Sequence, residues 1–247
     1  MHTSNSKLDE LVDWFRWAKD NPCNWNICAP FNQLHPRVVF FKSVPDNARF
    51  HDVGAGSGNL AVFKDWLMPP RPDIRLTGIS LLPGEKQHLY EKWIIDPWTR
   101  NLAFDGAHWD AIYASHFIEH IDDQFGFLEW SVANLKPGGQ LYLEWPSPAT
   151  RELPRRALIK EMTGVDMLAV SFYDDQTHLE KTPGSAVFAD YLRQLGMLVE
   201  KDGIIIMPYF QDKLLQEYFA MSDDYLAQAA WFLKTGWCSH IVARKPG

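Results

Sequence analysis

The sequence contains little cysteine and no run of apolar residues long enough to cross a membrane. Its three cysteines, Cys23, Cys28 and Cys238, are odd in number and form no C-x-x-C pair, which argues against a disulfide framework and a structural zinc site. No stretch approaches the ~18 uninterrupted apolar residues of a membrane span. The N-terminus, MHTSNSKLDELVDWFRW, lacks the basic stretch and apolar segment of a secretory signal. We therefore expect a reduced, cytoplasmic protein without a membrane partner.

An excess of basic residues is missing as well. Lysine and arginine number 24 against 31 aspartate and glutamate residues, which gives a net charge of −7. Because a nucleic-acid partner usually requires a basic face, none is expected. The length of 247 residues and the 46% hydrophobic content predict one α/β domain over 1–247 with a modest elaboration.

A glycine-rich loop at the end of an apolar strand is the most informative feature that the sequence does contain. In RFHDVGAGSGNL the strand ends at Asp52, three glycines follow (Gly54, Gly56 and Gly58), and a helix is expected from Asn59. Glycines allow a tight turn against a ligand, and the free N–H groups of a helix start point at it. This pattern predicts a nucleotide-shaped cofactor at the first strand of a parallel sheet. A dinucleotide fingerprint would need glycine in place of Asn59, so the spacing disfavours a nicotinamide dehydrogenase.

Strands and helices are expected to alternate along the chain. The expected strands are 48–53, 74–79, 93–96, 109–114, 139–144, 204–207 and 238–243, and the expected helices are 8–19, 31–43 (interrupted at Pro36), 59–67, 84–92, 122–135 and 186–195. This order predicts a parallel sheet with right-handed crossovers. We divide the chain into a helical N-terminal extension (1–46), a cofactor-binding half (47–145), an acceptor-side insertion (146–185) and the C-terminal half of the sheet (186–247).

Two motifs carry a resemblance to a known family. The pattern Asp-x-Gly-x-Gly-x-Gly from Asp52 resembles motif I of class I S-adenosylmethionine-dependent methyltransferases, and LKPGG before an apolar strand is similar to the turn that precedes their fifth strand. Within this family the chain resembles the type 11/23-like members of small-molecule and sugar pathways. The resemblance implies a Rossmann-like seven-stranded, mostly parallel sheet of order 3-2-1-4-5-7-6 with an antiparallel seventh strand. It also implies that the cofactor is S-adenosyl-L-methionine.

The same resemblance implies a set of cofactor-binding residues. Near the glycine loop these are Asp52, Gly54, Ala55, Gly56 and Gly58, and at the end of the fourth strand they are Ala114, Ser115 and His116. Ser80 and Leu81 follow the second strand, where many members carry an acid for the ribose, and Glu85 is the candidate to replace it; the alternative for this segment is a plain turn and helix start. Asp96 is expected at the adenine amine, with Trp98 or Leu102 stacking on the ring, although Trp98 is equally expected as a simple core residue.

The segment SFYDDQTHLEKTP is similar to the acceptor-side segment of sugar-pathway methyltransferases. His178 is the candidate general base, since neutral imidazole can take a hydroxyl proton near pH 7, with Asp175 or Asp174 orienting it. The alternative is that the two aspartates cap a turn and that His178 packs beside Pro183. No motif requires a metal.

These observations favour O-methylation of a small-molecule or glycan acceptor, with His178, Asp175 and His116 as candidate catalytic residues. For the pair Glu119-His120 a structural role is favoured. N- or C-methylation of a natural product, for which the aromatic residues of 14–31 offer a cation or ring surface, and a non-catalytic cofactor-binding subunit remain open.

Overall fold

A computed structural model describes residues 3–103, 109–179 and 181–247. Its contacts divide the chain into two compact units. The helical unit comprises Met1–Phe31, Pro146–His178 and Ile204–Cys238, and the sheet unit comprises Asn32–Trp145, Leu179–Gly203 and Ser239–Gly247. The boundaries expected at 46, 145 and 185 stay predictions. The single-domain organisation stays a prediction.

The sheet has the strand order expected from the family resemblance, β3-β2-β1-β4-β5-β7-β6. Its strands are β1 (Arg49–Val53), β2 (Arg75–Ser80), β3 (Lys92–Ile95), β4 (Trp109–Ser115), β5 (Leu135–Pro146), β6 (Leu198–Ile204) and β7 (Cys238–Arg244). The first five are parallel where they pair. Lys245, just after β7, exchanges backbone hydrogen bonds with Gly138 and Gly139 near the start of β5, which shows that β7 runs antiparallel to β5.

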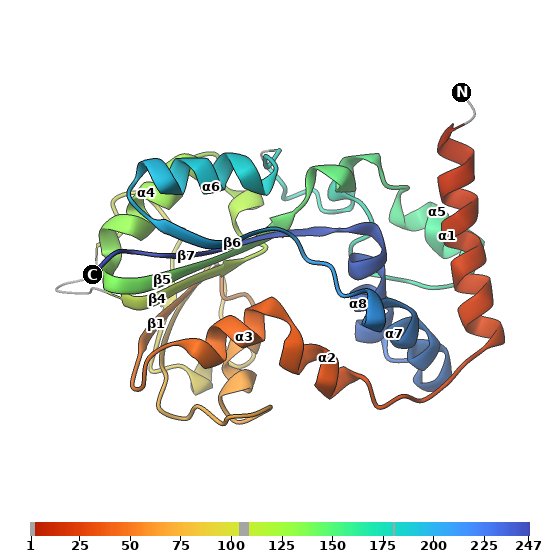
Figure 1. Ribbon diagram of the computed structural model, residues 1–247, viewed down its shortest axis with the longest axis horizontal. Helices are drawn as coiled ribbons and strands as arrows, with labels where there is room; N and C mark the ends of the chain where they lie inside the picture. The colour runs from red at the N-terminus through yellow and green to blue at the C-terminus, as the bar shows by residue number, and fades with distance from the viewer. Residues whose placement is uncertain (1–2, 104–108, 180) are drawn as a thin grey trace. The chain divides into compact units, whose positions relative to one another are not determined.

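Helices cover both faces of the sheet (Figure 1). On one face, α3 (Pro36–Ser43) packs Phe40 and Phe41 against Phe50 of β1. On the other, α4 (Gln124–Asn134) and α6 (Ser185–Gln194) bury a cluster that includes Phe127 and Phe188. Because side chains alternate across a strand, neighbouring residues of β4 belong to different clusters. The result is a sheet buried on both sides, as is usual for parallel sheets.

Two of the expected elements between strands are shorter than predicted. The segment 84–92 forms no long helix but one 3₁₀ turn, η2 (Gln87–Leu89), because its backbone bonds elsewhere: Lys86 N donates to Ser57 O (2.9 Å) and Glu91 N to Leu76 O (2.9 Å). The helix after the glycine loop begins at Asn59 as expected, but it is the 3₁₀ helix η1 (Asn59–Lys64).

The expected strand 204–207 is wrong, because the strand is β6, which ends at Ile204. β6 is an edge strand with a charged, largely exposed centre, and Arg244 Nε donates to Glu200 Oε1 across it (2.6 Å). Charged residues are typical of edge strands and hide the apolar alternation on which the prediction depended. The LKPGG turn also differs from expectation, since it forms the irregular start of β5, with Gly138 at φ +78°.

The helical unit contains α1 (Thr3–Asp20), the start of α2 (Cys28–Leu34), α5 (Arg156–Thr163), α7 (Pro208–Met221) and α8 (Asp224–Thr235), together with the short turns η4 (Pro148–Glu152) and η5 (Phe172–Asp174). Its core includes the tryptophans at 14, 231 and 237. The indole Nε1 atoms of Trp231 and Trp237 both donate to Val170 O (3.0 and 3.2 Å). These tryptophans therefore serve packing. Among the described helices, none combines the length and the apolarity that a bilayer crossing requires.

Candidate functional site

The glycine loop is held against the end of the neighbouring strand. Gly54 N and Ala55 N both donate to Ile79 O at the end of β2 (3.0 and 2.9 Å). Gly54, Gly56 and Gly58 all have positive φ angles, of +74°, +54° and +80°. A Cβ on Gly54 would lie 2.7 Å from Phe117 Cδ2, whereas a Cβ on Gly56 would meet only Gly54 O, at 3.9 Å, within the described part of the chain. The loop is therefore closely packed at Gly54 and open at Gly56.

A cavity of about 500 Å³ lies beside this loop, within the sheet unit. Seven residues expected in the site line it: Gly54, Gly56, Ser80, Leu81, Asp96, Trp98 and His116. The remaining lining residues are Ser57, Ile79, Leu82, Pro83, Pro97, Phe117, His120 and Ile121. The size is within the usual range for small-molecule sites.

The residues that the sequence reasoning missed follow directly on those it found. Phe117, His120 and Ile121 belong to the stretch after β4, where η3 (Ile118–His120) turns the chain back toward the cavity. A single turn of this kind leaves no periodic signal in the sequence. The feature of the sequence that points to these residues is their position directly after a parallel strand, where ligands bind in such sheets.

Asp96 and Trp98 line the cavity after β3. Asp96 N donates to Ser80 O (3.1 Å), which fixes the loop beside the end of β2. The Trp98 ring packs edge-on against Phe127 (5.2 Å) and Phe117 (6.3 Å). Its Nε1 is buried and has no hydrogen-bond partner among the described residues. Trp98 is thus both a core residue and a cavity wall. Residues 104–108 of this loop lie outside the described residues.

Asp52 lies in the strand that supports the loop and outside the cavity lining. Tyr90 Oη donates to Asp52 Oδ2 (2.6 Å). Burial raises the pKa of Asp52 to about 7, although the hydrogen bond from Tyr90 opposes the shift. The carboxyl is therefore a buried support for the loop.

Six other expected cofactor residues are also absent from the lining of this cavity: Ala55, Gly58, Glu85, Leu102, Ala114 and Ser115. Glu85 is exposed, and its nearest charged partner is Lys86 (3.8 Å). Leu102 O accepts a hydrogen bond from Trp130 Nε1 (2.8 Å), and Ala114 is buried in the core. Their roles toward a cofactor stay predictions.

His116 lies at the end of β4, between two carboxylates that have no exposed surface. Its Nε2 is 3.2 Å from Glu144 Oε1 and its Nδ1 is 3.4 Å from Glu119 Oε1. Glu144 also forms an ion pair with Arg37 and accepts a hydrogen bond from Tyr142 Oη (2.6 Å). Burial alone would raise the pKa of Glu144, but the charge of Arg37 and the hydrogen bond from His116 outweigh it and hold that pKa well below its usual range.

Comparison with known proteins identifies the family. The model described as "Methyltransferase domain" matches residues 31–244. The chain belongs to this methyltransferase family. It is an S-adenosylmethionine-dependent methyltransferase, as the family resemblance implied. A search of curated proteins finds no significant match.

Solved structures share the fold of this methyltransferase at low sequence identity. The plantazolicin methyltransferase BpumL, solved with a desmethylPZN analog and SAH, has a TM-score of 0.55 at 17% identity, with 99% of each chain covered. The Haemonchus contortus phosphoethanolamine N-methyltransferase 2 has a TM-score of 0.55 at 16% identity, covering 96% of this chain and 57% of the other. The [4+2]-cyclase SpnF has a TM-score of 0.54 at 18% identity, covering 92% and 84%. These likenesses show the fold.

The cavity residues fit S-adenosylmethionine. The space in front of Gly56 leaves room for a ligand close to the backbone. The carboxylate of Asp96 accepts hydrogen bonds, and the buried Trp98 Nε1 is a donor without a partner among the described residues. Leu81 and Leu82 add exposed apolar side chains to the lining, against which a planar base can pack.

His178 and Asp175 belong to the helical unit. His178 Nδ1 is 2.6 Å from Phe172 O. Since a carbonyl only accepts, Nδ1 carries the proton in the neutral ring and Nε2 carries the lone pair. Asp175 Oδ2 is 3.9 Å from that Nε2, while its Oδ1 accepts from the backbone N (2.8 Å) and Oγ1 (2.6 Å) of Thr177. The Phe172 carbonyl, rather than an aspartate, thus sets the His178 tautomer.

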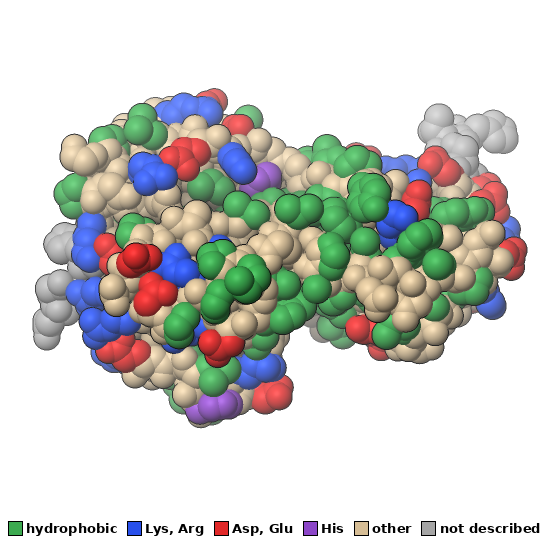
Figure 2. All heavy atoms as spheres, turned by 60° about the horizontal axis from the view of Figure 1, so that its bottom comes forward, with side chains coloured by type: hydrophobic (Ala, Val, Ile, Leu, Met, Phe, Trp, Pro, Cys, Tyr) green, Lys and Arg blue, Asp and Glu red, His purple; other side chains and the backbone are tan. Residues whose placement is uncertain are grey.

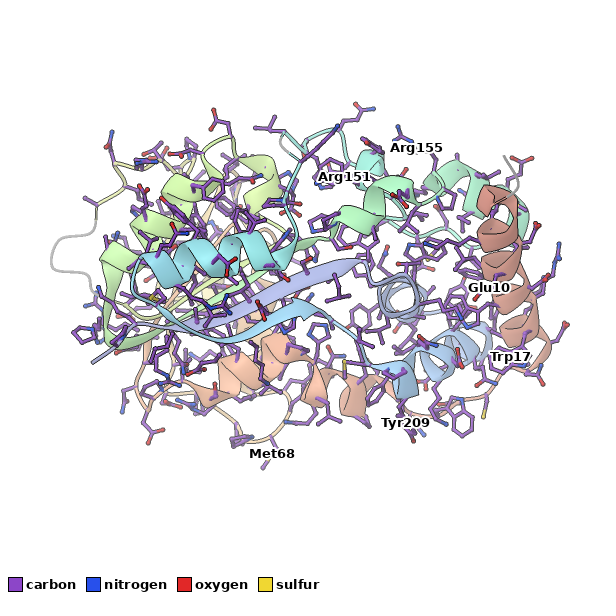
Figure 3. The ribbon with its side chains drawn as sticks, turned by 45° about the horizontal axis from the view of Figure 1, so that its top comes forward. Glu10, Trp17, Met68, Arg151, Arg155 and Tyr209 are labelled. Atoms are coloured by element: carbon purple, nitrogen blue, oxygen red, sulfur yellow. The ribbon has the colours of Figure 1, made fainter. Side chains whose placement is uncertain are left out.

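Asp174 caps a turn, which is the structural alternative given for it in the sequence analysis. Its carboxylate accepts from the backbone N–H groups of Arg156, Val170 and Ser171. Around the same turn, Arg151 stacks over Phe172 (5.6 Å) and Arg155 over Tyr173 (4.9 Å). Figure 3 shows these two arginines on one stretch of the helical unit. The His178 ring packs against Phe172, with 4.5 Å between the ring centroids, and Arg151 lies over the same phenyl ring.

Proposed function

We propose that this methyltransferase transfers the methyl group to a hydroxyl oxygen of a small-molecule or glycan acceptor, with His178 as general base. The observation that supports this proposal is the hydrogen bond from His178 Nδ1 to Phe172 O (2.6 Å). It leaves Nε2 as the proton-accepting atom of a ring whose orientation is fixed. A base of this kind is worth typically 10²–10⁴-fold in rate when the nucleophile is a hydroxyl.

Bound S-adenosylmethionine supplies an electrophilic methyl group on a sulfonium. The protein's part is to hold the acceptor in line with it, and positioning of reactants contributes up to ~7–11 kcal/mol in favourable cases. In our proposal the Asp96 carboxylate accepts a hydrogen bond from the adenine amine, Trp98 packs on the base, and Ser80 forms a hydrogen bond with a ribose hydroxyl. The lining of the cavity by all three supports these roles.

Charge on the surface supports a small or glycan acceptor. On the face of the sheet unit seen in Figure 2, acidic and basic side chains are interspersed. Together with the net charge of −7, this mixture offers a polyanion such as nucleic acid no attraction.

An amine acceptor is the second candidate, and one observation favours it. Lys213 Nζ lies 3.4 Å from the ring centroid of Trp25 and 5.2 Å from that of Tyr209. The rings of Trp25 and Tyr209 therefore contact an ammonium group, that of a lysine of the chain itself, which shows that aromatic rings here attract such a cation. The phosphoethanolamine N-methyltransferase of similar fold was solved with phosphomonomethylethanolamine, an amine.

Release of S-adenosylhomocysteine across matched acceptors tests the proposal. The panel pairs each alcohol, phenol or sugar with the corresponding amine, and the variants are His178→Ala and the exposed control His88→Ala. We expect turnover with a hydroxyl acceptor that falls at least about 10²-fold in His178→Ala and is unchanged in the control. Turnover on amines alone, or on a hydroxyl without loss in His178→Ala, would contradict the proposal.

A further inference from the structure

Two buried carboxylates contact the ring of His116, a residue that lines the cofactor cavity. Glu144 is near the end of β5 and Glu119 is in η3; neither side chain has exposed surface. The His116 ring, which is 29% exposed, reaches one carboxylate with each nitrogen, at 3.2 and 3.4 Å. All three residues belong to the sheet unit.

This geometry constrains the protons of the ring. A nitrogen that faces an ionised carboxylate oxygen is attractive to it only when it carries a hydrogen. A neutral imidazole carries one hydrogen and would turn a lone pair toward the other carboxylate. Contact of both nitrogens with carboxylates therefore favours the doubly protonated ring.

The charges around the ring lead to the same conclusion. Glu144 has a cationic partner in Arg37 and a further donor in Tyr142. Neither oxygen of Glu119 has a hydrogen bond among the described residues; a ring nitrogen of His116 is in ion-pair contact with one of them, and a ring nitrogen of His120 lies within 4.8 Å of the carboxylate. A buried carboxylate without a compensating charge is strongly disfavoured. An imidazolium at 116 balances Glu119, as Arg37 balances Glu144.

The same residue sets the turn that forms one wall of the cavity. His116 has φ +54°, and its backbone N donates to Glu144 O (2.8 Å). Directly after it, Phe117 packs so closely over Gly54 that a Cβ there would lie 2.7 Å away. His120 and Ile121 complete the wall.

We infer that His116 is held as an imidazolium bridging the buried carboxylates of Glu119 and Glu144, and that this bridge positions the Phe117–Ile121 wall of the cofactor cavity. His116 is thus a positioning residue, and with both nitrogens protonated it accepts no proton from an acceptor. This replaces the catalytic role expected for it from the sequence. The inference concerns the cofactor cavity alone and holds whichever acceptor atom is methylated.

The protonation state is tested by ¹⁵N NMR of the histidine rings in the full chain, with His116→Gln used to assign the signal. We expect two protonated ring nitrogens on His116 at pH 7 in the wild type. In Glu119→Gln, which keeps the shape but removes one charge, we expect the ring to lose its second proton at that pH. A neutral ring in the wild type, or a charged ring unaffected by Glu119→Gln, would overturn the inference.

The positioning role is tested by calorimetric titration with S-adenosylhomocysteine. We expect affinity to fall at least about tenfold in His116→Gln and in Glu119→Gln, and the double variant to lose no more than either single one, because both break the same bridge. The exposed His88→Gln should bind as the wild type does. Circular dichroism establishes that each variant is folded. Full affinity in folded His116→Gln, or additive losses in the double variant, would show that the bridge does not shape the cavity.

Discussion

Replacement of Gly56 by alanine should abolish much of the cofactor affinity at a modest and predictable cost in stability. The backbone at Gly56 has φ +54°, where an L-residue costs roughly 1–2 kcal/mol. Among the described residues the new Cβ would contact only Gly54 O, at 3.9 Å, which is too far to clash. Its steric effect therefore falls on whatever occupies the cavity in front of the loop.

Gly196→Ala is the matched control. Gly196 has φ +83°, a Cβ added to it would meet no described heavy atom within 4 Å, and it does not line the cavity. Both variants should lose about 1–2 kcal/mol in urea denaturation. In calorimetry with S-adenosylhomocysteine, Gly56→Ala should bind at least about tenfold more weakly, which is ~1.4 kcal/mol, and Gly56→Val should not bind measurably. Gly196→Ala should bind normally. Equal affinity in Gly56→Ala and the wild type would refute the placement of the cofactor against this loop.

Three further predictions concern single side chains. Asp96→Ala should weaken S-adenosylhomocysteine binding about tenfold in calorimetry, because a charge-assisted hydrogen bond contributes roughly 1.5–3 kcal/mol. The exposed control Asp65→Ala should bind as the wild type does. If Asp96→Ala loses no affinity, Asp96 has no part in adenine recognition. With a hydroxyl acceptor, His178→Ala should lower kcat about 10²-fold without changing cofactor affinity, whereas a small effect would indicate an amine acceptor. Burial raises the pKa of Asp52 to about 7. Between about pH 4 and 7 the folded chain therefore holds a proton on Asp52 that the unfolded chain has lost. The contribution of this carboxyl to the free energy of unfolding consequently falls as pH rises through this interval. Asp52→Asn should therefore gain stability relative to the wild type over that interval in urea titrations at several pH values, and a constant difference would contradict the shift.

The glycine loop was predictable because its pattern is local in the sequence, whereas the strand order was implied by the family resemblance that this pattern carries. Gly54, Gly56 and Gly58 all adopt positive φ angles, a backbone requirement that only a few residue types satisfy. Alternating strands and helices restrict a chain to few topologies. The segment 84–92 was mispredicted because its backbone groups bond to Ser57 and Leu76, which are distant in sequence, and local periodicity carries no trace of such partners.

The surroundings of His116 could be predicted only in part, and the reason is the register of β4 against β5. Glu119, three residues on, was visible beside His116 in the sequence. Glu144 comes next to it because Ser115 pairs with Glu144 in the parallel ladder. That pairing depends on a shift in the register of the two strands. Trp109 pairs with Leu135, but Ala111, two residues on, pairs with Gln140, so most of the LKPGG segment has no pairing partner in β4. A register continued regularly from Trp109 would place Leu141 opposite Ser115 and an apolar side chain beside the histidine. The irregularity therefore determines that a buried carboxylate faces His116. Its position cannot be predicted from the apolar pattern of the strands in a single sequence.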